Sequence, residues 1–96
     1  MLYTFSQANY EQDVLAQYLT DVTAQDAVVL WQDGVLLALK HADYFARCKA
    51  EYVVALEPDI SARHLTALWP QASQVRFISI DEFVRLTERF FPQIAL

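Results

Sequence analysis

The chain has 96 residues, of which 55% are apolar and 20% are charged, and its formal net charge is −5. The apolar fraction excludes a disordered chain, and the length is that of one small domain covering residues 1–96. No Lys or Arg precedes Lys40, so the basic surface that direct nucleic-acid binding needs is missing from the acidic first third.

The first third of the chain alternates between apolar runs and one amphipathic stretch. Residues 2–5 form a short apolar run that predicts a strand. Asn9 opens a helical pattern, with Gln12 three residues later as in a capping box. The continuous run from Ala27 to Trp31 is typical of a strand that is buried on both faces.

The middle of the chain repeats this order of elements. Residues 32–34 predict a turn, and residues 35–48 predict a helix. Residues 51–56 predict a third strand, which Pro58 stops.

A short helix and a fourth strand come next. Either Asp59 or Ser61 is expected to cap this helix, which Pro70 ends. The apolar, β-branched character of residues 75–80 predicts the fourth strand.

Asp81 is expected to cap a last helix, and residues 93–96 predict a short fifth strand at an edge of the sheet. Strands and helices in alternation imply right-handed crossovers. The predicted fold class is therefore α/β, a three-layer α/β/α architecture with a mostly parallel sheet of four to five strands. The apolar side chains expected on the inner face of the last helix are Phe83, Val84, Leu86, Phe90 and Phe91.

Functional side chains of a parallel sheet usually lie beyond the carboxyl ends of its strands. Here that edge carries Asp33, Asp59 and Asp81, and the only glycine of the chain, Gly34. A phosphate site needs glycine-rich turns and positive charge, so we expect no nucleotide, flavin or other cofactor. The residues after the first strand, 6–7, are not acidic, which argues against a magnesium-binding receiver domain, and we expect no metal site.

These residues have structural explanations as well. Asp59 and Asp81 are of the type that caps helices, and Asp59 can pair with Arg63 four residues later on one helix face. Asp33 and Gly34 form either a structural turn or part of a functional loop. In that turn, Gly34 meets a need for positive φ or for a close approach of two backbones.

Cys48 is the only cysteine and the only candidate nucleophile. One hypothesis is that its thiolate carries sulfur, helped by Arg47 and Lys49. The alternative is a half-buried small apolar residue, which its place late in a predicted helix favours. We therefore assign no catalytic residue, and Cys48 is the residue to test.

No feature of the sequence predicts export or a membrane span. The start of the chain has no basic region, and the longest apolar runs fall far short of the ~20 residues that a span needs. We expect a soluble, cytoplasmic protein. A chain this short cannot bury all its large side chains, so the apolar surplus predicts a protein partner. The side chains expected to contact it are Trp31, Trp69, Phe90 and Phe91.

Several stretches together resemble the TusB/DsrH family of sulfur-relay proteins. They have the family's order and spacing and span nearly the whole chain, which itself has the family's length. No single stretch is diagnostic. The matching stretches are residues 29–35, 54–56, 59–60, 62–63 and 80–87.

The resemblance implies a DsrE-like fold and assembly with TusC-like and TusD-like paralogues into a heterohexamer. In that family the complex passes persulfide sulfur from a TusA-like donor to a TusE-like acceptor. The sulfur becomes the 2-thio group of the wobble uridine in certain tRNAs. The persulfide cysteine belongs to the TusD-like subunit, so the resemblance implies that this chain is a non-catalytic subunit.

Two departures from the family pattern bear on the function. Sulfur-oxidising relatives carry a cysteine in the first helix, about where Tyr18 lies here, which favours the tRNA-thiolation branch for this chain. The family usually has glycine after the motif arginine, where this chain has His64. Either that helix is tightened differently, or His64 fills a space that glycine leaves open. The alternative functions are a direct persulfide carrier through Cys48 and an acidic interaction domain unrelated to sulfur transfer.

Overall fold

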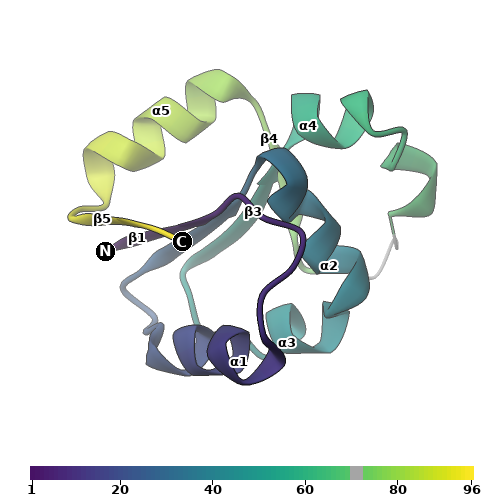
Figure 1. The fold of residues 1–96 in the computed structure, drawn as a ribbon. Helices are drawn as coiled ribbons and strands as arrows, with labels where there is room; N and C mark the ends of the chain where they lie inside the picture. Colours follow the sequence, from purple (N-terminus) through teal and green to yellow (C-terminus); the bar gives the residue numbers. More distant parts are fainter. Residues whose placement is uncertain (70–72) are drawn as a thin grey trace.

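A computed structural model describes residues 1–69 and 73–96 (Figure 1). Five strands form one sheet in the order β4-β3-β2-β1-β5, and all neighbouring strands are parallel. The predicted α/β class and parallel sheet are therefore confirmed, and β5 is the edge strand expected near the end of the chain. The strands are β1 (Leu2–Phe5), β2 (Ala27–Leu30), β3 (Tyr52–Leu56), β4 (Arg76–Ile78) and β5 (Gln93–Ala95).

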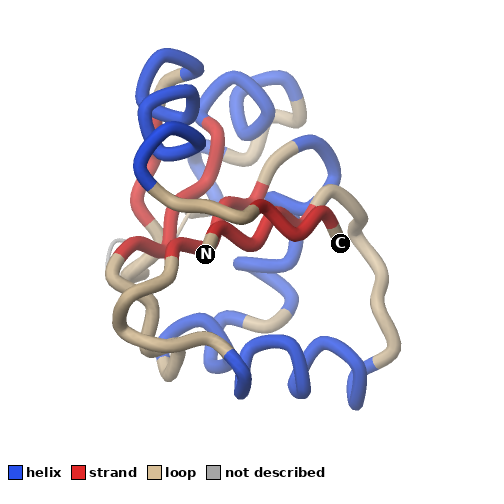
Figure 2. Tube along the Cα trace, turned by 90° about the vertical axis from the view of Figure 1, so that its left-hand side faces the viewer, coloured by secondary structure: helices blue, strands red, loops and turns tan. Residues whose placement is uncertain are grey.

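The helices divide unequally between the two faces of the sheet (Figures 1 and 2). The crossovers from β1 to β4 all run in one direction along the sheet, and only the connection from β4 to β5 returns. Right-handed crossovers therefore place α1 to α4 on one face and α5 alone on the other. The helices are α1 (Gln12–Asp21), α2 (Leu37–Lys40), α3 (Ala42–Ala46), α4 (Glu57–Ala62) and α5 (Ile80–Arg89), with the 3-10 helices η1 (Gln32–Leu36) and η2 (Thr66–Leu68).

Two apolar clusters agree with this division into layers. The buried side chains of α1 to α4 belong to the first cluster, whereas Phe83, Leu86 and the adjoining Phe90 belong to the second. The central strand β2 serves both clusters, because Val28 lies in the first and Val29 in the second. All four residues of β2 are buried, which explains its unbroken apolar sequence.

The start of α1 differs from the prediction. Its N-cap is Glu11, without a side-chain cap, so the predicted capping box at Asn9 is wrong. Asn9 Oδ1 instead accepts a hydrogen bond from Lys40 Nζ at 2.6 Å, and the Ala8 carbonyl accepts another at 3.0 Å. The Asn9 side chain thus ties the loop before α1 to the end of α2.

Residues 35–48 do not form the single helix that their sequence predicts. The segment is divided among η1, α2 and α3, and His41, with φ −131° and ψ 47°, separates the last two. Val35 and Leu37 are both fully buried in the first cluster. A regular helix turns about 100° per residue, so these two side chains would point to nearly opposite sides of it. Core packing therefore opposes one regular helix here.

α4 begins directly after β3. Its N-cap is Leu56, so the prediction of Asp59 or Ser61 as the cap is wrong. Pro58 lies in the first turn, where a missing N–H does no harm. The helix ends at Ala62, and Pro70, the predicted end, lies outside the described residues.

His64 is the second residue after the end of α4, directly after the C-cap Arg63. Its φ is 57°, its N–H donates to the Ser61 carbonyl at 3.0 Å, and the N–H of Leu65 donates to the Ile60 carbonyl at 3.1 Å. This is a Schellman ending, whose left-handed residue is most often glycine. His64 is exposed and so fills no space in the core. Of the two explanations for His64 at the family's glycine position, the structure favours the tightened helix end.

α5 begins at Ser79 and not at the predicted cap, Asp81. Ser79 Oγ accepts from the Glu82 N–H at 3.2 Å, and Glu82 Oε1 accepts from the Ser79 N–H at 3.1 Å, which completes a capping box. The sequence contains this Ser-x-x-Glu capping motif, but the predicted fourth strand extends to Ile80 and so includes Ser79. Asp81 lies in the first turn, where its charge suits the helix dipole.

Only part of the predicted inner face of α5 is buried. Phe90 is buried, and Phe83 and Leu86 are half-buried against the second cluster. Val84 and Phe91, which were also expected to face inward, are exposed. Val84 is turned away because one residue rotates the side chain by about 100° from that of Phe83.

A buried carboxylate, Asp26, joins the amino ends of β1 and β2. Its Oδ1 lies 3.1 Å from the Met1 ammonium, and its Oδ2 accepts from the Thr23 N–H at 2.8 Å and the Thr23 hydroxyl at 3.1 Å. Burial raises the pKa of Asp26, but the hydrogen bonds and the ammonium outweigh it and hold the pKa below its ordinary value. Asp26 is therefore charged at neutral pH.

Candidate functional site

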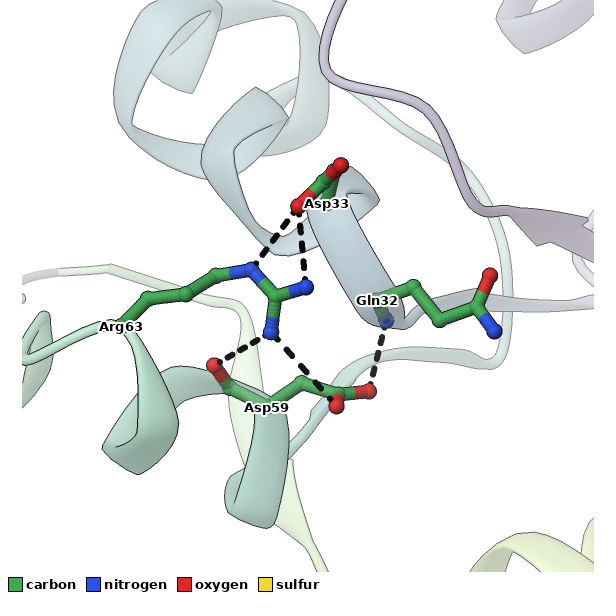
Figure 3. A network of polar contacts seen from close by, with 4 residues as sticks. All are labelled: Gln32, Asp33, Asp59 and Arg63. Atoms are coloured by element: carbon green, nitrogen blue, oxygen red, sulfur yellow. Dashed lines mark hydrogen bonds and ion pairs between the residues drawn. The ribbon is translucent and has the colours of Figure 1, made fainter.

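Three of the predicted site residues meet at the carboxyl edge of the sheet. The Arg63 guanidinium lies between the carboxylates of Asp33 and Asp59 (Figure 3). Its Nε and Nη2 donate to Asp33 Oδ1 at 3.0 and 2.9 Å. Its Nη1 donates to the Asp59 carbonyl at 3.1 Å and lies 3.6 Å from Asp59 Oδ1. The expected Asp59–Arg63 pair is present, and the closer Asp33 partner was not expected.

The second carboxylate oxygen of Asp59 holds the turn after β2. Asp59 Oδ2 accepts from the backbone N–H of Gln32 at 2.6 Å (Figure 3). Gln32 has a φ of 53°, a left-handed conformation that side chains disfavour. The network of Gln32, Asp33, Asp59 and Arg63 therefore fixes η1 against α4, which is a more specific role for Asp59 than the predicted helix cap.

Gly34 lies in the same turn and has no positive φ, which leaves a close backbone approach as its explanation. A Cβ atom on Gly34 would lie 1.9 Å from the Phe5 carbonyl oxygen and 2.6 Å from its carbon. The Trp31 N–H donates to the same Phe5 carbonyl at 3.1 Å. Gly34 thus lets the turn lie directly against the end of β1.

The charged groups of this cluster are paired with one another. Both carboxylates are directed at the guanidinium, so the cation is already paired and is not left to bind an anion. Asp81 does not join them, and it has no polar partner among the residues that the structure describes. The geometry therefore favours the structural turn over the functional loop for Asp33 and Gly34.

Arg63→Lys is expected to lower the free energy of unfolding by roughly 1 kcal/mol, because a lysine cannot make the paired bonds to Asp33. Urea denaturation of the purified chain measures this. Arg47→Lys is the matched control, since Arg47 is exposed and its side chain has no polar partner among the described residues. Equal stabilities for the two variants would show that the network contributes little.

Cys48 lies far from this network, at the amino edge of the sheet. It follows the end of α3 by two residues, and the chain enters β3 four residues later. The thiol is half-buried beside a shallow cavity of about 300 Å³, whose lining includes Leu19, Tyr44 and Lys49. Burial raises the pKa of the Cys48 thiol, and the charge of Asp26 adds to this. The neutral thiol therefore predominates at neutral pH.

Of the large side chains expected to contact a partner, only Phe91 is well exposed. Phe90 is buried in the core of its own chain, which makes that expectation wrong for it. Trp31 packs edge-on against Phe83, and Trp69 packs against Phe77. Trp69 Nε1 also donates to the Val75 carbonyl at 3.2 Å, whereas Trp31 Nε1 is buried and has no hydrogen-bond partner in the described part of the chain.

Two further properties concern the described part of the chain. None of its helices combines the length and apolar content required to cross a lipid bilayer. Within residues 1–69 and 73–96, no three His, Cys, Asp or Glu side chains gather into a group that would hold a metal ion.

Comparison with known proteins shows similarity along the whole chain. Residues 7–93 match the family described as "DsrH like protein". Protein TusB of Cronobacter sakazakii is 40% identical, with 99% of each chain covered, and an uncharacterized protein of Haemophilus influenzae is 55% identical over all of both chains. The solution NMR structure of protein Tm0979 from Thermotoga maritima matches with a TM-score of 0.58 and 27% identity, covering 92% of each chain.

Proposed function

The chain belongs to the DsrH family, and from this membership we propose that it is a non-catalytic subunit of a TusBCD-type sulfur-transfer complex. Its partners in this proposal are TusC-like and TusD-like paralogues in a cytoplasmic heterohexamer. The complex passes persulfide sulfur from a TusA-like donor to a TusE-like acceptor for 2-thiolation of the tRNA wobble uridine. The observation that carries the proposal is full-length similarity to proteins named TusB.

The environment of Cys48 supports a role without a nucleophile. A cysteine accepts sulfur by attack of its thiolate on the terminal sulfur of a persulfide, so the thiolate fraction and access to the sulfur both matter. Burial disfavours the Cys48 thiolate and restricts access to it. Arg47 and Lys49 border the same cavity, but the pKa of the thiol is nevertheless raised.

The Arg63 network supports a structural role in the same way. It holds together η1 and α4, two elements at the edge where a parallel sheet usually carries its functional groups. Its charged groups pair with one another. Internally paired charges are expected in a subunit that has a structural role while the persulfide cysteine belongs to a paralogue.

Cys48→Ser is expected to leave the level of 2-thiolated tRNA unchanged in cells that lack the wild-type copy. The reason is that serine keeps the size of the side chain while removing the only thiol of this subunit. Thiolated tRNA is quantified by mass spectrometry of nucleosides, or by gel retardation in a mercury-containing gel.

Two controls make this result interpretable. Cells without the gene set the lower limit, and substitution of the persulfide cysteine of the TusD-like partner shows that the assay detects a lost carrier. A loss in Cys48→Ser as large as in the deletion, with the complex still assembled, would make Cys48 a carrier and overturn the proposal.

A further inference from the structure

Three of the exposed large apolar side chains lie on α5 or directly after it. Ile80 is 57% exposed, Val84 is 49% exposed, and Phe91, just past the helix, is 73% exposed. Ile80 and Val84 are four residues apart and share one side of the helix, which Thr87 continues. The Thr87 hydroxyl donates to the Val84 carbonyl at 2.6 Å and is thereby satisfied within the helix. We refer to Ile80, Val84, Thr87 and Phe91 as the α5 stripe.

The two flanks of α5 differ in their surroundings. On the flank over β3 and β4, Arg85 and Arg89 line a groove, and Arg89 donates to the Tyr52 hydroxyl and to Glu51, each at 3.0 Å. The helical members of the α5 stripe lie on the other flank. Within the described part of the chain, right-handed crossovers place the other α-helices on the opposite face of the sheet from α5. None of the described helices therefore packs beside the stripe on that face.

The charges beside the α5 stripe are acidic. Asp81 and Glu88 are seven residues apart, which places them two turns apart on one line along the helix, next to Ile80 and Val84. Both are exposed, and neither has a polar partner among the residues that the structure describes. A partner that binds the stripe is therefore expected to carry Lys or Arg at the border of its own contact surface.

A second copy of the chain does not meet this requirement. In a two-fold pairing of α5 with α5, equivalent flanks of the two helices face each other. Asp81 and Glu88 would then meet the same two carboxylates of the other copy, and like charges at such positions repel.

We propose that the α5 stripe is the surface on which this chain docks a paralogous subunit, through an apolar face of the paralogue bordered by Lys or Arg. This inference rests on the proposed function, because the TusBCD-type complex supplies the paralogues. The inference specifies which surface of this chain makes the contact, and which charge the contacting surface of the paralogue carries. The apolar side chains of the stripe are buried on association, which favours binding. The acidic border disfavours partners whose contact surface is also acidic.

The test is Val84→Asp in the full chain, co-expressed with TusC-like and TusD-like paralogues and purified through a tag on a paralogue. A carboxylate placed in an apolar contact loses its water without gaining a partner, so binding is expected to weaken roughly tenfold or more. Val14→Asp is the matched control, since Val14 is an exposed valine on α1, on the opposite face of the sheet. The circular dichroism spectrum and melting temperature of each isolated variant verify that it folds.

The outcomes separate the surface from the function. Loss of binding in Val84→Asp but not in Val14→Asp supports the proposal, whereas equal binding of both overturns the surface and leaves the function standing. A wild-type chain that binds neither paralogue overturns the proposed function and this inference with it. A stable dimer of the isolated chain that Val84→Asp abolishes would make a second copy the occupant and overturn the inference.

The acidic border gives an independent arm of the same experiment. The double variant Asp81→Lys with Glu88→Lys is expected to bind the paralogue several-fold more weakly, and the difference is expected to shrink as salt is raised. Unchanged or tighter binding by the double variant would overturn the proposed basic border of the partner.

Discussion

Replacement of Gly34 by alanine is expected to lower the free energy of unfolding by roughly 3 kcal/mol or more, or to prevent folding altogether. The added Cβ would lie 1.9 Å from the carbonyl oxygen of Phe5, a distance that no pair of such atoms adopts. The two nearest atoms, the Phe5 carbonyl oxygen and carbon, both belong to the backbone. β1 lies between β2 and β5, so it cannot move away without breaking hydrogen bonds on both sides. Urea denaturation, or the melting temperature of the purified variant, measures the loss.

Gln32→Gly is the control in the same turn. Gln32 is exposed with a φ of 53°, and its side chain makes no polar contact with the described residues. Its backbone N–H, which glycine retains, donates to Asp59. This variant is expected to keep the stability of the wild type or to gain up to about 1 kcal/mol, because glycine adopts positive φ without strain. Similar losses in both variants would mean that the turn is sensitive to any change, and not to a clash with Phe5.

Asp26→Asn is expected to lower the free energy of unfolding at pH 7 by roughly 2 kcal/mol, since a charged acceptor of three contacts becomes a neutral amide. The effect has a defined pH dependence. The folded-state pKa of Asp26 lies below the ordinary value of 3.8, so its contribution is present in full above that value. It is lost as the pH falls through the folded-state pKa, because the unfolded chain binds the proton more readily.

The stability difference between wild type and Asp26→Asn is therefore expected to be constant from pH 7 down to about pH 5 and to shrink below about pH 4. Urea denaturation at a series of pH values measures it. Asp43→Asn makes the same chemical change on the surface and is expected to stay within about 0.5 kcal/mol of the wild type. A difference that grows toward low pH would contradict the lowered pKa.

The strands were predictable from sequence because their signal is local. The apolar run from Ala27 to Trp31 has no polar residue for either face, which only a strand covered on both sides tolerates. The observed β2 ends one residue earlier, at Leu30. Four other strands fall within one or two residues of their expected bounds, and their order along the chain implies the parallel sheet.

Helix ends were less predictable, because several side chains compete for each end. Asp81 has the composition of a cap, but Ser79 takes the position and Glu82 completes the motif. At the start of α4, Pro58 allows the helix to begin two residues before Asp59. The Asp59 carboxylate is then free to reach the turn after β2, a partner 27 residues away in sequence.

The candidate site was predictable in its members but not in its geometry. Asp33, Gly34, Asp59 and Arg63 all stand out as residue types at the carboxyl edge, and only the pair four residues apart has a spacing that sequence alone can interpret. The Asp33–Arg63 contact joins residues 30 positions apart and depends on how η1 and α4 pack. Gly34 is the only glycine of the chain, which indicated that its position is constrained. The constraint is the nearby Phe5 carbonyl, and no local sequence pattern reveals that contact.

The pairing of β5 with β1 determines when the sheet can close during synthesis of the chain. Leu2 pairs with Gln93 and Thr4 with Ala95, and the Leu96 N–H donates to the Thr4 carbonyl at 2.8 Å. While a ribosome makes the protein, β1 leaves first, but one edge of it keeps unpaired backbone groups until residue 95 follows. Such an edge can pair with strands of other nascent chains. The sheet is therefore completed only after residues 93–95 have been made, and this edge of β1 stays open for pairing until then.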